Sequence, residues 1–308
     1  MEWEAGLIEW LQANFSAPGD FSKYYDFFGA ETGMLLLVMI VMFCWKKEVG
    51  HRLVLVVACV NMWLPMIKSA VLRPRPYMDY PDRIKPLALS DEGAEAMDVA
   101  AQGYSFPSMH SASIPASYFT LAKEAKKKWL WIVAAFLTVL VGFSRVVAGM
   151  HYPTDVLAGW ILGFAVMGIF SLLDRYVHKE WLYHLILIIS ALPGAFFVRT
   201  ADYFTSLGCI IGAIVAIYFE RRYVNFQGTR RIVTMILRVA GAIIVYLVVN
   251  TLLKLPFDKD FLAGASLGAL LVRACRYAIV MFLIMGVYPV IFPLFERTGK
   301  EYKNENKI

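Results

Sequence analysis

The sequence predicts an all-α fold, a polytopic helical bundle in a membrane. Of its 308 residues, 59% are hydrophobic, and the mean hydropathy is +0.58. Both values are too high for an ordinary soluble domain. Apolar runs long enough to cross a bilayer also recur along the whole chain, which is the pattern of a protein with many membrane spans.

The apolar runs predict nine spans. The last run is long for a single crossing, so its first part, 261–272, is expected to form a short helix of its own. We expect the domains to be an N-terminal non-cytoplasmic segment, a core, additional transmembrane helices and a cytoplasmic tail, at 1–26, 27–180, 181–295 and 296–308. The predicted spans are 27–45, 52–72, 106–122, 129–148, 155–173, 181–198, 203–219, 232–253 and 261–295.

The distribution of basic residues predicts the orientation of these spans. With the N-terminus outside the cytoplasm, the inner loops contain 17 Lys and Arg residues and the outer segments contain 9. The positive-inside rule therefore favours an outside N-terminus and a cytoplasmic C-terminus. The net charge of +6 accordingly indicates orientation, and nucleic acid is not expected as a partner. Short loops and the absence of a recognisable targeting signal favour a bacterial plasma membrane.

Three polar stretches interrupt the apolar pattern. They are "KSAVLRPRP" at 68–76, "YSFPSMH" at 104–110 and "SRVVAGMHYPTD" at 144–155. On the predicted topology all three lie at the outer membrane boundary. Ionisable groups at that depth are costly and usually functional. The sequence therefore predicts one functional site on the non-cytoplasmic face.

The residue types in these stretches indicate phosphate chemistry. Guanidinium groups bind phosphate oxygens in pairs, and lysine adds a point charge. Backbone amides at a helix start, expected just after Pro107, also favour an anion. A neutral imidazole can attack phosphorus, and a second one can serve as general acid and base. The candidate residues are Lys68, Arg75, Ser108, His110, Arg145, His151 and Asp155.

The spacing of His151 and Asp155 suggests how the nucleophile is prepared. Asp155 follows His151 by four residues, so its carboxylate can hold one ring nitrogen as a donor and leave the other free to attack. Cations stabilise the charge on the equatorial oxygens during phosphoryl transfer. Because they occupy the position that a metal would take, we expect no metal and no other cofactor.

The three stretches resemble the motifs of the type 2 phosphatidic acid phosphatase superfamily of integral-membrane lipid phosphatases. The family pattern K-x6-R-P, P-S-G-H and S-R-x5-H-x3-D matches at Lys68 to Pro76, Pro107 to His110 and Ser144 to Asp155. The resemblance covers about residues 50–175 and implies a six-helix phosphatase core, followed here by about three further helices. It implies that His151 is the nucleophile, Asp155 its partner and His110 the acid and base. It also implies that Lys68, Arg75, Ser108, Met109 and Arg145 bind phosphate.

One position departs from the family pattern. Met109 stands where the motif usually has glycine. That position is expected to present its backbone amide to phosphate, and methionine retains the amide while its side chain narrows the pocket. Sphingosine-phosphate phosphatases are similar in lacking this glycine, so the departure bears on substrate preference more than on activity.

Three functions compete. The leading one is hydrolysis of a lipid phosphate monoester or diphosphate through a phosphohistidine, with a lipid phosphate and the bilayer as partners and a monomer as the default state. The second is a phosphatase for soluble sugar phosphates that resembles glucose-6-phosphatase. The third is a lipid-binding or lipid-translocating protein with a degenerate site. The related vanadium haloperoxidases are soluble, which the predicted spans argue against.

Other conspicuous residues have ordinary interpretations. Arg73 either pairs with an anionic head group or extends to the interface. The loop 77–103 is either a lid or a solvated loop. The spacing of Gly159 and Gly163 predicts close helix packing within one chain. Internal pairing or interfacial exposure is expected for the arginines in late apolar runs, and packing roles for the cysteines. These residues are Arg238, Arg273, Arg276, Cys44, Cys59, Cys209 and Cys275.

Overall fold

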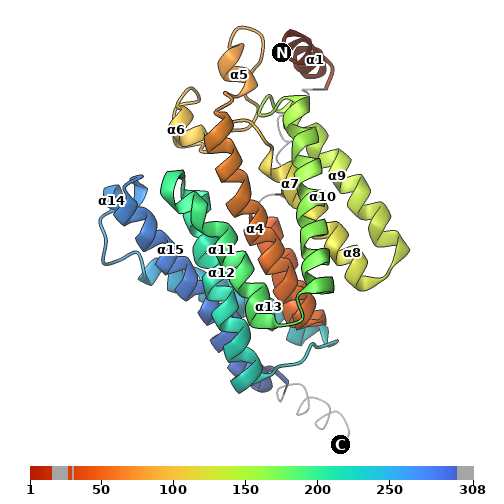
Figure 1. Ribbon diagram of the computed structural model, residues 1–308, viewed down its shortest axis with the longest axis vertical. Coiled ribbons are helices and arrows are strands. Elements are labelled where there is room, and N and C mark those ends of the chain that lie inside the picture. Colours follow the sequence, from red (N-terminus) through yellow and green to blue (C-terminus); the bar gives the residue numbers. More distant parts are fainter. Residues whose placement is uncertain (16–26, 30, 297–308) are drawn as a thin grey trace, which may run out of the picture. The chain divides into compact units, whose positions relative to one another are not determined.

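A computed structural model describes residues 1–15, 27–29 and 31–296 (Figure 1). The predicted N-terminal segment therefore lies partly outside the described residues, and the predicted cytoplasmic tail lies almost wholly outside them. Every regular element in the described residues is helical. This confirms the all-α prediction.

Seven helices of the described chain are long and apolar enough to cross a membrane. The chain is therefore a multi-pass membrane protein, as the apolar runs predict. Four of them are single helices: α9 (Lys128–Val147), α10 (Pro153–Tyr176), α11 (Glu180–Phe197) and α13 (Ile232–Leu252). The span Lys47–Asp79 joins α4 (Lys47–Val71) and α5 (Pro76–Asp79). The span Ala201–Val224 begins with α12 (Ala201–Phe219), and the span Leu267–Glu296 begins with α15 (Leu267–Phe282).

Two of the nine predicted spans are helical but are not among these seven. The run 27–45 forms α3 (Glu31–Ile40) and a π-helical turn, Val41–Trp45, which together are short for a crossing. The run 106–122 forms α7 (Met109–Ile114), a π-helical turn, Pro115–Phe119, and α8 (Thr120–Ala125). Pro115 has no backbone N–H to donate, so the regular α-helical hydrogen bonding is interrupted there.

The last predicted run divides near the expected place. A short helix, α14 (Lys259–Ala263), precedes α15. The hydroxyl of Ser266 accepts a hydrogen bond from the Ala269 amide at 3.3 Å and so caps the start of α15. The short helix is therefore present, although it ends earlier than residue 272.

The chain divides into two compact units. One comprises 1–34 and 63–179, and the other comprises 35–62 and 180–308. The partition passes through α4, whose first part belongs to the second unit and whose last part belongs to the first. In the second unit α12 packs along α15 (Figure 1). All the candidate phosphate-chemistry residues belong to the first unit.

Within the first unit, α10 packs directly on α7 (Figure 1). A Cβ atom on Gly159 would lie 2.6 Å from the carbonyl oxygen of Ser108, and one on Gly163 would lie 2.3 Å from that of Ala112. Only glycine permits this approach of the two backbones. The two glycines therefore serve packing within the chain, as predicted, and they bring the second motif against the third.

The N-terminal helix α1 (Glu2–Phe15) packs against α9 in the same unit. The ring of Phe15 meets the ring of Phe143, near the end of α9, edge to face at 5.7 Å. The amide of Gln12 donates to the carbonyl oxygens of Lys85 and Val147 at 2.8 and 3.0 Å. Helix α1 is thus joined to both the 77–103 loop and the end of α9.

Candidate active site

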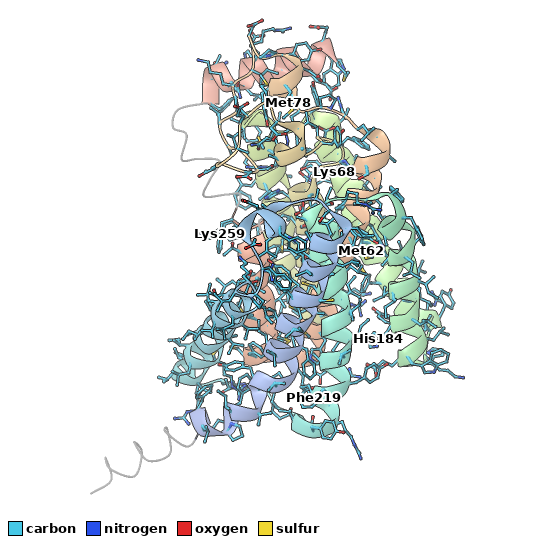
Figure 2. All side chains as sticks on the ribbon, turned by 90° about the vertical axis from the view of Figure 1, so that its left-hand side faces the viewer. Met62, Lys68, Met78, His184, Phe219 and Lys259 are labelled. Atoms are coloured by element: carbon cyan, nitrogen blue, oxygen red, sulfur yellow. The ribbon has the colours of Figure 1, made fainter. Side chains whose placement is uncertain are left out.

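The three sequence motifs meet in the first unit. Lys68 lies in the last turn of α4 and is labelled in Figure 2. The second and third motifs are joined by a backbone hydrogen bond, in which the Ser108 amide donates to the Asp155 carbonyl at 3.0 Å. The charges of Lys68 and Arg75 act on both His110 and His151. Residues that are distant in sequence therefore share one electrostatic environment, as the motifs predict.

Lys68 links the first motif to the second. Its ammonium group donates to the carbonyl oxygen of Tyr104 at 2.5 Å. Tyr104 begins the stretch that leads into α7. The contact holds this stretch beside the end of α4, and it places a permanent positive charge next to the start of α7.

Arg75 is buried and holds the 77–103 loop. Its guanidinium donates to the carbonyl oxygens of Gln102, Gly103 and Met150 and to the Ser90 hydroxyl. A hydrogen bond within the loop adds to this, because the side-chain oxygen of Gln102 accepts from the Ser90 amide at 2.9 Å. The loop is therefore tied to the site through an arginine of the motif, although many of its residues are exposed, and its role as a lid stays a prediction.

The second motif forms the start of α7. The fully buried Ser108 is the N-cap residue, and its hydroxyl accepts from the Ser111 amide at 3.4 Å and from the Ser111 hydroxyl at 2.9 Å. Met109 and His110 follow as the first helical residues. Amides in a first helical turn have no carbonyl partner within the helix, so they are available to an anion.

The third motif begins in the last turn of α9 and ends in the first turn of α10. Arg145 is 5% exposed and lies in the last turn of α9. Gly149 then adopts a φ of +71°, which turns the chain. His151 follows, with only 3% of its surface exposed. Burial lowers the pKa of His151 to about 3, against the opposing influence of Asp155, so the imidazole is neutral at neutral pH.

Asp155 is held by three groups at the start of α10. Its carboxylate accepts from the Tyr152 amide at 2.8 Å, from the Arg73 guanidinium at 2.7 Å and from the Ser105 hydroxyl. Its Oδ2 atom lies 3.8 Å from Nδ1 of His151. That distance is too long for a hydrogen bond, and the neutral imidazole forms no ion pair with the carboxylate. The predicted neighbours are therefore adjacent, although the predicted hydrogen bond between them is not formed.

Asp155 also belongs to a network of charged and polar side chains that the sequence did not reveal, formed with Arg73, Glu4 and Thr154. Arg73 also donates to the Glu4 carboxylate at 3.0 Å, and its guanidinium stacks on the Tyr152 ring at 4.0 Å from the centroid. Glu4 accepts in turn from the amide and hydroxyl of Thr154, at 3.1 and 2.7 Å. Neither sequence interpretation of Arg73 is correct, because it pairs inside the protein and its side chain is only 14% exposed.

The sequence of α1 contains a weak indication that Glu4 takes part in this network. Glu4 is 3% exposed and lies among buried positions at helical spacing, namely Ala5, Ile8, Leu11 and Gln12. A carboxylate on a buried helical face requires a partner. The opposite face of α1, however, is also apolar, with Trp3 and Trp10 exposed by 63% and 56%. Because both faces carry apolar residues, the sequence does not show which face packs on the protein.

We also searched the described residues for side chains that could together bind a metal ion. In the part of the chain that the structure describes, no three His, Cys, Asp or Glu side chains form a group that could hold a metal. The permanent positive charges of the site come from Lys68, Arg75 and Arg145.

Two family models match the chain. The model of the PAP2 superfamily matches residues 34–179, and that of a PAP2 superfamily phosphatase transmembrane extension matches 204–300. Phosphatidylglycerophosphatase B of Bacillus subtilis is 32% identical over 168 residues, which cover 49% of this chain and 74% of that protein. The chain belongs to the PAP2 superfamily. All the predicted site residues fall in the first match, whereas Glu4 precedes it.

Other PAP2 relatives match over shorter stretches or at lower identity. An undecaprenyl-diphosphatase of Sulfolobus acidocaldarius is 45% identical over 60 residues, which cover 20% of this chain and 29% of that protein. A lipid A 4'-phosphatase of Bacteroides thetaiotaomicron is 25% identical over 159 residues, which cover 47% and 68%. No solved structure is significantly similar to the chain.

Proposed function

We propose that this chain is a metal-independent membrane phosphatase that hydrolyses a lipid phosphate monoester or diphosphate through a phosphohistidine. The observation that carries the proposal is the meeting of a buried, neutral His151 with Asp155 at 3.8 Å, within reach of the charges of Lys68 and Arg75. The named activities of three relatives support it, since each of those proteins is named for a lipid phosphate or diphosphate.

The first chemical step transfers the phosphoryl group to His151. Because Nδ1 faces Asp155, Nε2 is the nitrogen that attacks phosphorus. Burial and the charges of Arg75 and Lys68 lower the pKa of His110 to about 4, and the negative charge of bound phosphate offsets those cations and favours the protonated imidazole. As the N–P bond forms, the bond from phosphorus to the lipid oxygen breaks, and protonated His110 gives that oxygen a proton. The Asp155 carboxylate stabilises the positive charge that develops on the imidazole of His151.

The second step releases the phosphoryl group. His110, now neutral, accepts a proton from water, whose oxygen attacks phosphorus while the N–P bond breaks. Inorganic phosphate leaves and both histidines return to their starting states. Lys68, Arg75, Arg145, the Ser108 hydroxyl and the amide of Met109 bind the phosphate oxygens and stabilise their charge in both steps.

The bilayer determines how substrate reaches this site. The candidate residues of the first and third motifs lie at the ends of α4, α9 and α10, which are membrane-spanning by length and apolarity, and those of the second lie at the start of α7. A lipid head group enters there while its chains remain among the apolar helices. The positive-inside distribution supports a non-cytoplasmic catalytic face, an outside N-terminus and a bacterial plasma membrane.

A phosphate-release panel with purified protein tests the proposal. Phosphatidate, phosphatidylglycerophosphate, undecaprenyl diphosphate and a sphingoid phosphate are compared with glucose 6-phosphate, each with and without excess EDTA. We expect release from at least one lipid, undiminished by EDTA. Release from glucose 6-phosphate alone would assign the enzyme to soluble substrates, and a strict metal requirement would refute the mechanism.

Histidine variants test the nucleophile in the same assay. His151→Ala should lose at least about 10³-fold in turnover, as expected for a nucleophile. His178→Ala, which removes an exposed histidine of the same unit, should retain full activity. Protein quenched in alkaline denaturant, in which the N–P bond of a phosphohistidine persists, should carry phosphate on His151, and a phosphoryl group trapped on any other residue would contradict the assignment.

A further inference from the structure

A second concentration of positive charge lies in the other compact unit, where α13 ends and α15 begins. A cavity of about 380 Å³ is lined there by Lys254, Lys259, Arg273, Arg276 and Tyr277, among others. We refer to it as the basic cavity. Lys259, labelled in Figure 2, lies in α14. All of these residues belong to the transmembrane extension, and none belongs to the part that matches the PAP2 superfamily model.

The cations of the basic cavity have no acidic partner among residues 1–15, 27–29 and 31–296. In the described residues none of the four forms an ion pair with a carboxylate. Asp258 and Asp260 flank Lys259 in sequence, but neither is paired with it. The charge of the cavity is therefore uncompensated within the described chain.

Arg276 is the most constrained of the four. It is 5% exposed and lies within the membrane-spanning segment Leu267–Glu296. One guanidinium nitrogen donates to the side chain of Asn250 at 2.8 Å, but Nε has no hydrogen-bond partner in the described structure. A buried arginine in an apolar segment is costly unless it is paired. An anion in the cavity would provide the missing counter-charge for the guanidinium.

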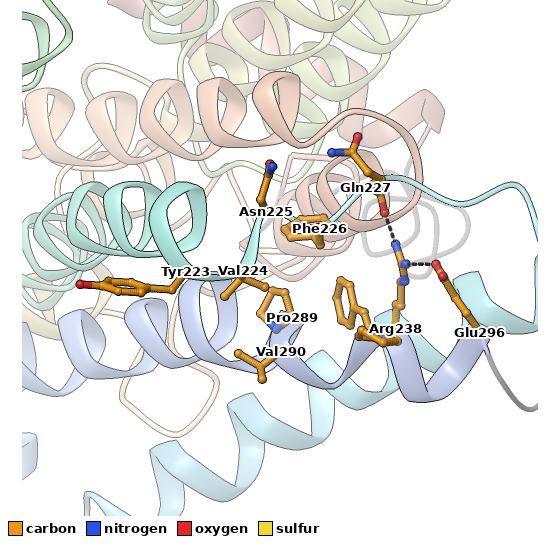
Figure 3. A pocket seen from close by; sticks show the side chains of 11 residues that line it. Tyr223, Val224, Asn225, Phe226, Gln227, Arg238, Pro289, Val290 and Glu296 are labelled. Atoms are coloured by element: carbon orange, nitrogen blue, oxygen red, sulfur yellow. Dashed lines mark hydrogen bonds and ion pairs between the residues drawn. The ribbon is translucent and has the colours of Figure 1, made fainter.

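In another cavity of this unit, the arginine has both a carboxylate and carbonyl oxygens as partners. Figure 3 shows Arg238 bound to Glu296 and to the Gln227 carbonyl, at 2.9 and 2.8 Å. Arg238 also donates to the Phe43 carbonyl at 2.7 Å. Of the two expectations for Arg238, internal pairing and interfacial exposure, the structure shows internal pairing. Because the positive charge is already neutralised there, that cavity offers little to an anion, and the basic cavity differs from it in this respect.

The location of the basic cavity indicates the kind of anion. The ends of membrane spans lie at the level of lipid head groups, so a basic pocket between membrane helices at such an end is positioned to contact an anionic head group. Guanidinium and ammonium groups together suit phosphate oxygens. The neighbouring Leu255 and Leu267 are exposed by 71% and 47%, which provides apolar contact for lipid chains. We propose that the basic cavity binds a phosphate group, held by Arg273 and Arg276 within and by Lys254 and Lys259 at its edge.

Binding of phosphatidylglycerol tests this site directly. The purified protein is titrated with dioleoyl phosphatidylglycerol, and bound lipid is counted by native mass spectrometry. The double variant Lys254→Gln/Lys259→Gln removes two exposed charges and should fold normally. A basic side chain that contacts the lipid phosphate contributes about fivefold to affinity, so we expect the loss of both lysines to weaken binding about 25-fold. Dioleoyl phosphatidylcholine should bind equally weakly to both proteins.

A matched control removes the same charge elsewhere. Arg222→Gln/Arg230→Gln deletes two exposed cations of the same unit outside the cavity and should bind phosphatidylglycerol like the unaltered protein. Equal affinity of the two double variants would overturn the proposal. Arg273→Gln, tested alongside them, should weaken binding as well, because its guanidinium lines the cavity.

Competition by inorganic phosphate distinguishes the two sources of the ligand. Displacement of phosphatidylglycerol by millimolar phosphate would assign the cavity to free phosphate, and its persistence would assign it to a lipid head group. The lysine double variant should hydrolyse the substrates of the candidate active site at the unaltered rate, since it changes no residue of that site. This readout separates failure of the second site from failure of the proposed function.

Discussion

Asp155 has two tasks at the start of α10. It accepts a hydrogen bond from the Tyr152 amide, as a carboxylate in the first helical turn often does. It also lies beside His151. Because Arg73 and Ser105 also donate to its carboxylate, its orientation is set in part by residues that the family pattern does not specify. We infer that Arg73 is a positioning residue that acts on His151 through Asp155.

Replacing Arg73 should lower turnover more than substrate affinity. Without its guanidinium, the fully buried Asp155 loses its charged donor and its defined orientation, and a misplaced catalytic group can cost on the order of 10²-fold. We expect Arg73→Gln to reduce kcat by about that factor with little change in KM. Steady-state kinetics on the best lipid substrate measures both.

Arg83 provides the control for this prediction. It also binds α1, through Glu2 and Glu9 at 3.0 and 2.9 Å, but it does not contact Asp155. If Arg73 merely attached α1 to the protein, Arg83→Gln would have a similar effect. We expect it to leave kcat unchanged, and equal losses in the two variants would reject the positioning role.

His110 offers a test that separates proton transfer from phosphate binding. A lipid alkoxide needs a proton in order to leave, whereas nitrophenolate does not. His110→Ala should therefore lose about 10²–10⁴-fold on a phospholipid and much less on p-nitrophenyl phosphate. The comparison requires single-turnover rates of phosphoenzyme formation, because His110 is also expected to activate water in the second step. Equal losses on both substrates would mean that His110 mainly binds phosphate.

At the scale of elements, α10 brings the motifs together through its backbone. In its first turn, the carbonyl oxygen of Asp155 accepts a hydrogen bond from the Ser108 amide. Its glycines allow α7 to approach closely. The residues of the second motif are thus positioned by main-chain contacts that depend on the absence of side chains. A change in this packing should disturb the site even though it alters no catalytic group.

Alanine at Gly159 should destabilise the protein and reduce its activity. The new Cβ atom would lie 2.6 Å from the Ser108 carbonyl oxygen, and such overpacking costs about 1–3 kcal/mol. Gly168 lies in the same helix with no atom within 4 Å of the position of its Cβ. Gly168→Ala should therefore be neutral or stabilising by up to about 1 kcal/mol. Thermal unfolding in detergent compares the two, and an equal response would disprove the packing argument.

At the scale of the whole molecule, the distribution of basic residues predicts that the candidate active site faces away from the cytoplasm. The 77–103 loop, which Arg75 attaches to the site, should then be outside. The segment 221–231, with four arginines, should be inside. Both segments contain exposed positions that can carry a reporter.

Cysteine labelling in intact cells measures this topology. In a background without native cysteines, Glu95→Cys should react with a membrane-impermeant thiol reagent, and Arg230→Cys should react only after the cells are permeabilised. Both residues are exposed in the structure, so a lack of reaction reports the membrane barrier. The reverse pattern would place the catalytic face in the cytoplasm. The cysteines to be replaced are Cys44, Cys59, Cys209 and Cys275.

The sequence alone predicted most of the membrane helices and named the motif residues of the candidate site. Apolar length predicts a membrane helix because a bilayer has a fixed thickness, and that argument needs no partner residue. The motif residues are recognisable because their types and spacings lie within short stretches of chain. The interruption at Pro115 was also readable from the sequence, and the prediction of a continuous span there overlooked it.

Only the tertiary structure decided which charges pair. Arg73 joins Asp155 and Glu4, which lie 82 and 69 residues away in the chain, and Arg276 lies in a cavity with no carboxylate partner among the described residues. Periodicity describes which face of a helix is apolar, but a charge attracts any opposite charge that the fold brings near. The pairing of buried charges therefore depends on helix packing, which is set by contacts between distant segments.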